Sequence, residues 1–186
     1  MHVKNIFALQ VESNTTSNNI DLTLSDEHFA NSVLEVHNLS IMFKSSKFES
    51  TNIFVFGNKE NVQIHFIGCI WRTHQDLEIK SKQYLNISYT VFIKFMNCKF
   101  ITVGSSLLLI KQANYLHVDH CYFSESISMH VSFTNEVNIQ NTILKYISTP
   151  SKTTIITVLY AVKVQIKETI AQNISHSLIS MRHASH

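Results

Sequence analysis

Charged residues, glycine and proline are all scarce in this chain of 186 residues. Lysine, arginine, aspartate and glutamate make up only 15% of it and leave a formal net charge of +2. The electrostatic field of so small a net charge is too weak to attract nucleic acid, and the sequence has no acidic tail that could bind a partner. With only 3 glycines and 1 proline, the turns are expected to be irregular.

Long apolar runs are also missing. No run reaches the roughly 18 residues that a membrane-spanning helix needs. The first ten residues, Met1 to Gln10, have too short an apolar centre for a secretion signal. We therefore expect a soluble segment without a signal peptide or a membrane span, or one cut from a longer protein.

Isoleucine, valine, threonine, phenylalanine and tyrosine are plentiful, whereas alanine and leucine do not dominate. These residue types favour a pleated surface over helices. With 45% hydrophobic residues, the chain can bury one sizeable core but hardly two. The composition predicts a single β domain.

The three cysteines mark a repeated phrase of eight residues. The copies with cysteine are Ile64–Trp71, Ile93–Phe100 and Leu116–Phe123, and the copies without cysteine span 34–41, 137–144 and 164–171. The first, third and last positions are apolar in every copy, whereas the second is mostly polar. This alternation is typical of a strand with one buried face.

The alternation breaks at the same place in every copy, so the chain must turn there. The residues at the break are Asn38, Gly68, Asn97, His120, Asn141 and Glu168. Glycine and asparagine tolerate the left-handed conformation that a short corner demands. A third strand precedes four of the phrases, with apolar pairs at Leu85 and Ile87, Leu108 and Ile110, Met129 and Val131, and Ile156 and Val158. Three strands per copy, with copies 21 to 30 residues apart, indicate the coils of a solenoid.

The phrase Ile93–Phe100 resembles the repeat of right-handed β-helix proteins of the pectin-lyase-like superfamily, and the resemblance covers about residues 20–181. It implies an all-β, right-handed parallel β-helix of about six to seven three-stranded coils. Because that superfamily holds lyases, hydrolases, epimerases, adhesins and plain scaffolds, the resemblance does not specify a function. The competing fold is an antiparallel β-sandwich, which gives no reason for the repeated break.

We expect one β-helix domain over residues 1–186, as a segment of a longer solenoid, because neither end shows a capping helix. Residues 1–19 would form an irregular or degenerate first coil, and residues 182–186 a frayed tail. Leu22 and Leu24 would supply the third strand of the coil that leads into the first phrase.

Cys69, Cys98 and Cys121 occupy one inward column, where we expect stacked, reduced thiols. A disulfide between two of them is the weaker alternative, because three is an odd number and no CxxC spacing occurs. A metal site at Cys121 and its neighbours His117, Asp119 and His120 is not expected, because these side chains point in different directions. The sequence predicts no metal and no cofactor.

No catalytic residue is predicted either. The outward positions of the sheet that would carry catalysis are Asn86, Leu109, His130 and Thr157, without the paired carboxylates that sugar cleavage uses. Asp119 stands alone in its column. Catalysis within this segment is therefore not expected, and whether the full-length protein is an enzyme stays open.

One outer column holds an apolar stripe of four residues, Ile70, Tyr122, Ile143 and Ile170, with Ser40 and Lys99 in the same column. Either the variable loops cover this stripe or it binds a partner. The predicted function is a non-catalytic β-helix scaffold for adhesion or for binding glycan or protein. The alternative is an inactive or partial segment of a polysaccharide-active enzyme whose catalytic acids lie elsewhere.

Four glycosylation sequons, at Asn14, Asn38, Asn86 and Asn173, weakly favour an extracellular or secreted location. Further solenoid coils are expected to adjoin this segment.

Overall fold

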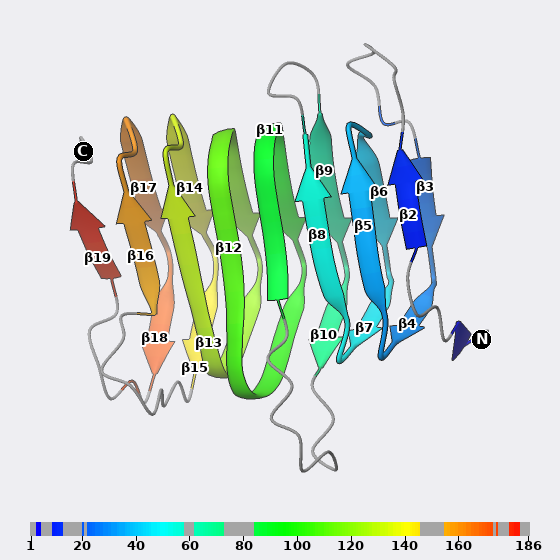
Figure 1. Cartoon of the computed structure of the whole chain (residues 1–186). Helices are drawn as coiled ribbons and strands as arrows, with labels where there is room; N and C mark the ends of the chain where they lie inside the picture. The colour runs from blue at the N-terminus through cyan, green and yellow to red at the C-terminus, as the bar shows by residue number, and fades with distance from the viewer. Residues whose placement is uncertain are drawn as a thin grey trace.

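The chain folds into three stacks of parallel strands in a computed structural model. The structure describes residues 3–4, 9–12, 20, 22–57, 62–72, 84–145, 155–172, 174 and 179–182, with the backbone alone for 3–4, 9–12, 84, 102–107 and 125–127. All regular secondary structure in these residues is β-strand. Each turn of the chain visits the three stacks in order (Figure 1).

Stack I, at the front of Figure 1, contains β2 (Leu9–Glu12), β5 (Val33–His37), β8 (Asn52–Phe56), the first part of β11 (Tyr84–Met96), the middle of β12 (Lys99–Asp119), the last part of β13 (Tyr122–Ser132), β16 (Ile156–Leu159) and β19 (Ile179–Arg182). Stack II, at the rear, contains β3 (Leu22–Ser25), β6 (Ile41–Lys44), β9 (Gln63–Ile67), the later parts of β11 and β12, β14 (Glu136–Gln140) and β17 (Lys163–Lys167). Stack III, at the bottom, contains β1 (Val3–Lys4), β4 (His28–Ala30), β7 (Lys47–Glu49), β10 (Ile70–Arg72), the first parts of β12 and β13, β15 (Ile143–Lys145) and β18 (Ile170–Gln172).

The arrangement confirms the predicted parallel β-helix. In Figure 1 the front strands run upward, the rear strands run downward, and successive turns step from the N-terminal end on the right to the C-terminal end on the left. That is the sense of a right-handed coil, the hand that L-amino acids favour in parallel crossovers. Stack II alone holds seven strands in the described part of the chain.

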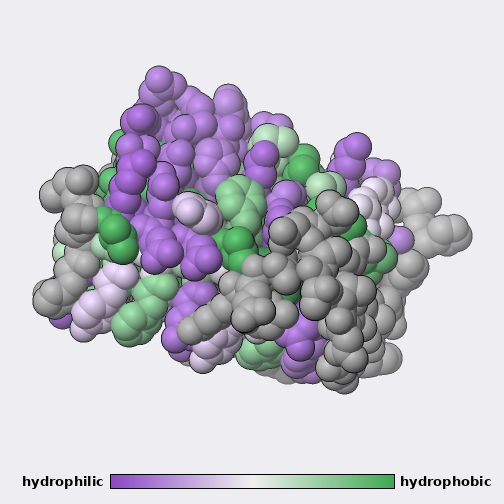
Figure 2. Space-filling model, turned by 90° about the horizontal axis from the view of Figure 1, so that it is seen from above, coloured by the Kyte–Doolittle hydropathy of each residue, from purple (hydrophilic) through white to green (hydrophobic). Residues whose placement is uncertain are grey.

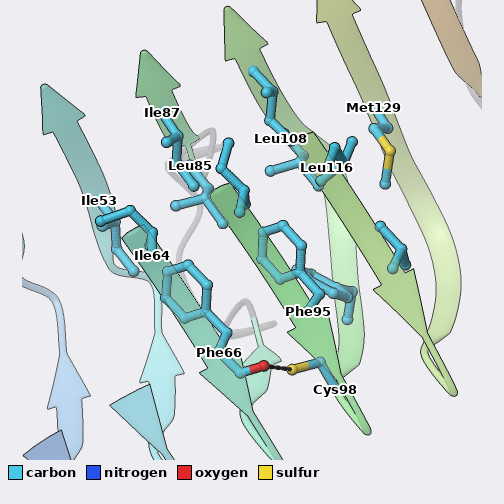
Figure 3. Packing of buried hydrophobic residues seen from close by; sticks show 14 of the residues in the cluster. Ile53, Ile64, Phe66, Leu85, Ile87, Phe95, Cys98, Leu108, Leu116 and Met129 are labelled. Carbon is cyan, nitrogen blue, oxygen red and sulfur yellow. Dashed lines mark hydrogen bonds between the residues drawn. The ribbon is translucent and has the colours of Figure 1, made fainter. Parts of the chain in front are cut away.

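The core lies inside the coil and consists of inward side chains repeated from turn to turn (Figure 3). Two aromatic columns run along it. Phe43, Phe66 and Phe95 stack with ring centroids 5.1 Å apart in both steps. The second column comprises Phe29, Phe48, Trp71, Phe100 and Phe123, with steps of 4.4 to 5.4 Å between ring centroids. Because each ring covers the next, the parallel stacking of the strands and the burial of the rings support one another.

The predicted inward and outward positions are confirmed in the phrase Leu116–Phe123. Leu116, Val118, Cys121 and Phe123 are buried, whereas His117, Asp119 and Tyr122 are only half-buried. The predicted third-strand pairs are buried as well, and their strands lie side by side in stack I.

The prediction that residues 34–41 form a copy of the repeated phrase is wrong. Leu34 pairs with Ile53 in stack I, and the residue that aligns with Ile64 in stack II is Ile41. The true copy therefore runs from Ile41 to Phe48. One turn earlier, Leu22 pairs with Ile41, so β3 belongs to stack II and is not a third strand.

Most corners use residues in the left-handed conformation. Between stacks II and III these are Asp26, Ser45, Gly68, Asn97, His120, Asn141 and Glu168, with φ between +47° and +65°. The residue after the corner is often a small hydrogen-bond donor that points inward. Thr142 Oγ1 donates to the Gln140 carbonyl at 2.8 Å, and Ser46 Oγ donates to the Lys44 carbonyl at 3.1 Å. The same carbonyls also accept backbone amides, Lys44 from Asp26 at 2.9 Å and Gln140 from His120 at 3.3 Å, so the hydroxyl adds a second hydrogen bond at the corner.

Gly57 follows β8 at a turn where two backbone segments approach closely. A Cβ on Gly57 would lie 2.1 Å from the backbone oxygen of Tyr89. The Gly57 amide also donates to the Ser88 carbonyl at 2.9 Å, so the two turns cannot separate freely. We expect Gly57→Ala to lower the free energy of unfolding by about 1–3 kcal/mol in urea titrations.

Gly68→Ala is the matched control for this substitution. Gly68 has φ +65°, but the nearest atom to a Cβ there would lie 3.8 Å away. Only the conformational penalty applies, about 1 kcal/mol. A larger loss at Gly68 than at Gly57 would contradict the close contact with Tyr89.

Candidate functional site

A groove lies on the outer surface of stack III, at its corner with stack II. Its volume is about 450 Å³, and it is lined by Lys99, Ile101, His120, Cys121, Tyr122, Asn141 and Ile143. Three neighbouring turns supply these residues: the first part of β12, the corner before β13 with β13 itself, and the corner before β15 with β15 itself. The size is in the range of small-molecule sites in proteins.

The predicted stripe runs through this groove. Tyr122 pairs directly with Ile143, and Ile143 with Ile170, in the parallel ladder of stack III. Ile70 lies on the other side, separated from Tyr122 by Lys99. Ile143 is 37% exposed and Ile170 52% exposed, whereas Ile70 and Tyr122 are half-buried. The groove therefore brings together Tyr122 and Ile143, with Ile70 and Ile170 beyond its two ends.

Ser40 does not belong to the stripe, contrary to the expectation from the sequence. It is buried and accepts a hydrogen bond from the Gln63 amide at 3.1 Å. Because the copy at 34–41 is out of register, the residue next to Ile70 in this row is Lys47.

Asp119, His120 and Asn141 form a polar cluster at the corner. Asp119 Oδ1 lies 2.8 Å from His120 Nδ1 and accepts a hydrogen bond from Asn141 Nδ2 at 3.0 Å. Burial alone would raise the pKa of the Asp119 carboxyl, but hydrogen bonds from Asn141 and Gln140, together with His120, lower it below its usual value. The carboxylate is thus ionised and fixes the imidazole by Nδ1. His120 Nε2 remains for a ligand, and this side chain is 60% exposed.

The outer surface of stack III carries more cations than anions among the described residues. Lys47, Arg72, Lys99 and Lys145 lie on its outward rows. Glu49 shares these rows, but His28 Nε2 lies 2.9 Å from its Oε2. The surface is therefore weakly basic around the groove.

The three cysteines are free and buried, as predicted. Cys69 Sγ donates to the Phe43 carbonyl at 3.3 Å. Cys98 Sγ donates to the Phe66 carbonyl at the same distance of 3.3 Å (Figure 3). Burial raises the pKa of the Cys98 thiol well above its ordinary value, so this sulfur stays protonated. Ser46 and Thr142 occupy the equivalent position after the left-handed corner in other turns, and both donate to a backbone carbonyl. The cysteines are therefore used here as small inward hydrogen-bond donors.

The described residues contain no group of three or more histidine, cysteine, aspartate or glutamate side chains that could hold a metal ion. His117, Asp119, His120 and Cys121 do not form such a group. The described part of the chain also contains no helix long and apolar enough to cross a membrane.

The row considered for catalysis lies on the outer surface of stack I. Asn86 pairs with Leu109, Leu109 with His130, and His130 with Thr157. All four are half-buried, and burial lowers the pKa of His130. None of the four is an acid, and the nearest described acid in the same row is Glu35, which Phe54 separates from Asn86.

Sequence reasoning missed a set of exposed aromatic residues at the corner between stacks I and II. Tyr89, Phe133 and Tyr160 take the left-handed conformation there, with φ between +54° and +57°. Each follows the last inward residue of a stack I strand by two positions, namely Ile87, Val131 and Val158. That fixed offset was the signal in the sequence that could have identified the corner.

Comparisons with protein families, with curated proteins and with solved structures find no match. The fold itself defines the class of protein: an all-β parallel β-helix built from repeated three-stranded coils.

Proposed function

We propose that this chain is a non-catalytic β-helix scaffold of the pectin-lyase-like superfamily that acts outside the cell and binds a glycan in the groove of stack III. The observation that carries the proposal is the meeting of the predicted stripe with a mainly apolar groove that polar side chains border. Tyr122 and Ile143 supply an aromatic ring and an aliphatic side chain side by side. Lys99, His120 and Asn141 border the same space with an ammonium, an imidazole and an amide.

These groups suit a sugar because its rings offer both apolar C–H surfaces and hydroxyl groups. An aromatic side chain covers the former, and side-chain donors of fixed orientation bind the latter. His120 is held by Asp119, and Asn141 by the same carboxylate, so both are oriented before a ligand arrives. Preorganised polar groups lose less entropy on binding.

We expect Tyr122→Ala to weaken glycan binding by about tenfold, which corresponds to about 1.4 kcal/mol. Polysaccharides bound by the wild-type chain on an immobilised array would be titrated against the variant by calorimetry. Tyr115→Ala is the matched control, because Tyr115 is another outward tyrosine, which is exposed on β12 but lies on stack II. An equal loss in both variants, or a wild-type chain that binds only proteins, would refute the glycan site.

Product assays on the same polysaccharides test the alternative, a partial segment of a polysaccharide-active enzyme. The contact between Asp119 and His120 is the one feature near the groove that resembles acid–base machinery. Release of reducing ends or unsaturated sugars from a bound polysaccharide, abolished by Asp119→Asn, would favour that alternative. Binding without products favours the scaffold.

A further inference from the structure

The edge between stacks I and II, here called the upper edge, carries exposed aromatic residues in three of its turns. Tyr89 is 42% exposed, Phe133 58% and Tyr160 50%. Gln112 takes the same left-handed position in the turn between Tyr89 and Phe133. Figure 2 looks down on this edge and shows apolar residues among hydrophilic ones.

The turn itself does not call for aromatic residues. The same left-handed conformation at the corner of stacks II and III is filled by asparagine, aspartate, serine, histidine, glutamate and glycine. Bulky side chains are unfavourable in this region of backbone space, whereas glycine and asparagine adopt it at little cost. Three solvent-exposed rings in strained positions therefore indicate a role other than folding.

The rings are not arranged as a flat platform. Phe133 and Tyr160 stack on each other, with centroids 4.9 Å apart and planes 6° from parallel. Each ring therefore has one face covered by the other, and part of each ring remains accessible to a ligand. Aromatic edges carry partial positive charge and attract carbonyl and carboxylate oxygens. A sugar needs an open ring face, whereas a polypeptide offers apolar side chains and oxygen acceptors together.

Among the described residues beside the upper edge, positive charges outnumber negative ones. Lys111 and Arg182, both exposed, lie at its margins, and neither forms an ion pair with another described residue. Glu136 is neutralised by Lys163, whose Nζ lies 3.0 Å from its Oε1. An acidic ligand fits these cations better than a basic one.

We propose that the upper edge is a docking surface for a partner protein, which it contacts through an extended segment that carries apolar side chains next to carboxylates. The segment lies along the edge, across the turns that hold Tyr89, Gln112, Phe133 and Tyr160. The rings act as rigid anchors, because few rotatable bonds separate each from the backbone. Lys111 and Arg182 pair with the carboxylates. This surface is separate from the groove of stack III, so the two ligands can bind at the same time.

The experiment uses a phage-displayed library of short random peptides selected on the 186-residue chain. Selected peptides are expected to combine apolar residues with aspartate or glutamate. Synthetic copies should bind the double variant Phe133→Asn/Tyr160→Asn about tenfold more weakly or worse, and Lys111→Gln more weakly by a smaller factor. Ile170→Asn, which alters an exposed apolar residue on stack III, should leave peptide binding unchanged.

The stability of the same double variant is a second readout. Because asparagine suits the left-handed conformation, its urea midpoint should equal or exceed that of the wild type, while peptide binding is lost. A lower midpoint would show that the rings serve folding and would overturn the proposal. So would a library without peptides that depend on the two rings, or wild-type binding to phosphatidylserine–phosphatidylcholine vesicles that the double variant loses.

Discussion

Phe95→Ala is expected to lower the free energy of unfolding by about 3–5 kcal/mol. Phe95 is fully buried, and its ring stacks on Phe66 with centroids 5.1 Å apart and meets Phe100 edge-on at 5.8 Å. Alanine would leave a cavity in the first aromatic column, next to Phe100 of the second. The neighbouring rings cannot move in to fill it, because hydrogen-bonded strands on either side hold them in place. Urea unfolding followed by circular dichroism would measure the loss.

Phe92→Ala is the matched control, since it makes the same change on the same strand. Phe92 points outward, is half-buried, and meets His65 edge-on with centroids 5.5 Å apart. The expected loss is about 0.5–1.5 kcal/mol, the worth of such an aromatic contact. Equal losses at Phe92 and Phe95 would contradict the inward and outward assignment of β11.

The fold could be predicted because the same physical demand recurs in every turn. An inward column needs apolar residues, and a corner needs a residue that tolerates the left-handed conformation. Ile93, Phe95, Asn97 and Phe100 show both demands within one phrase, and all take the places expected of them. Cys98 was correctly placed inside, although its role as a donor to a backbone carbonyl was not visible in the sequence.

The error at residues 34–41 has a physical cause. Asn38 is a left-handed corner residue, preceded by the inward pair Leu34 and Val36 and followed by the buried Leu39. The corner between stacks II and III has the same local order of features. A sequence pattern therefore cannot separate the two corners, and only the pairing of Ile41 with Ile64 shows which one is present.

The candidate site was predictable only in part. Tyr122 and Ile143 follow from the outward column, because strand periodicity fixes their direction. His120 and Asn141 sit at corners, where the direction of a side chain depends on contacts with neighbouring turns such as that with Asp119. The aromatic residues of the upper edge were missed because they depart from the residue types expected at such corners. The expectation that left-handed corners prefer glycine or asparagine does not point to Phe133 or Tyr160.

Ile93→Ala should cost about 2–5 kcal/mol, and Ile179→Ala distinctly less. The two residues are matched in size and both point inward, but their surroundings differ. Ile93 is fully buried and pairs with Ile64 on one side and Leu116 on the other. Ile179 is half-buried and pairs with Ile156 on one side.

The difference follows from how burial stabilises a side chain. A residue that already contacts water in the folded state loses less transfer free energy on truncation, and the space left behind opens to solvent rather than forming a cavity. Both variants would be unfolded in urea at several protein concentrations, because association of chains could cover Ile179 and raise its cost. Equal losses at every concentration would contradict the half-buried position of Ile179 in β19. A loss at Ile179 that grows with concentration would instead mean that chains associate through the exposed side of this last described turn.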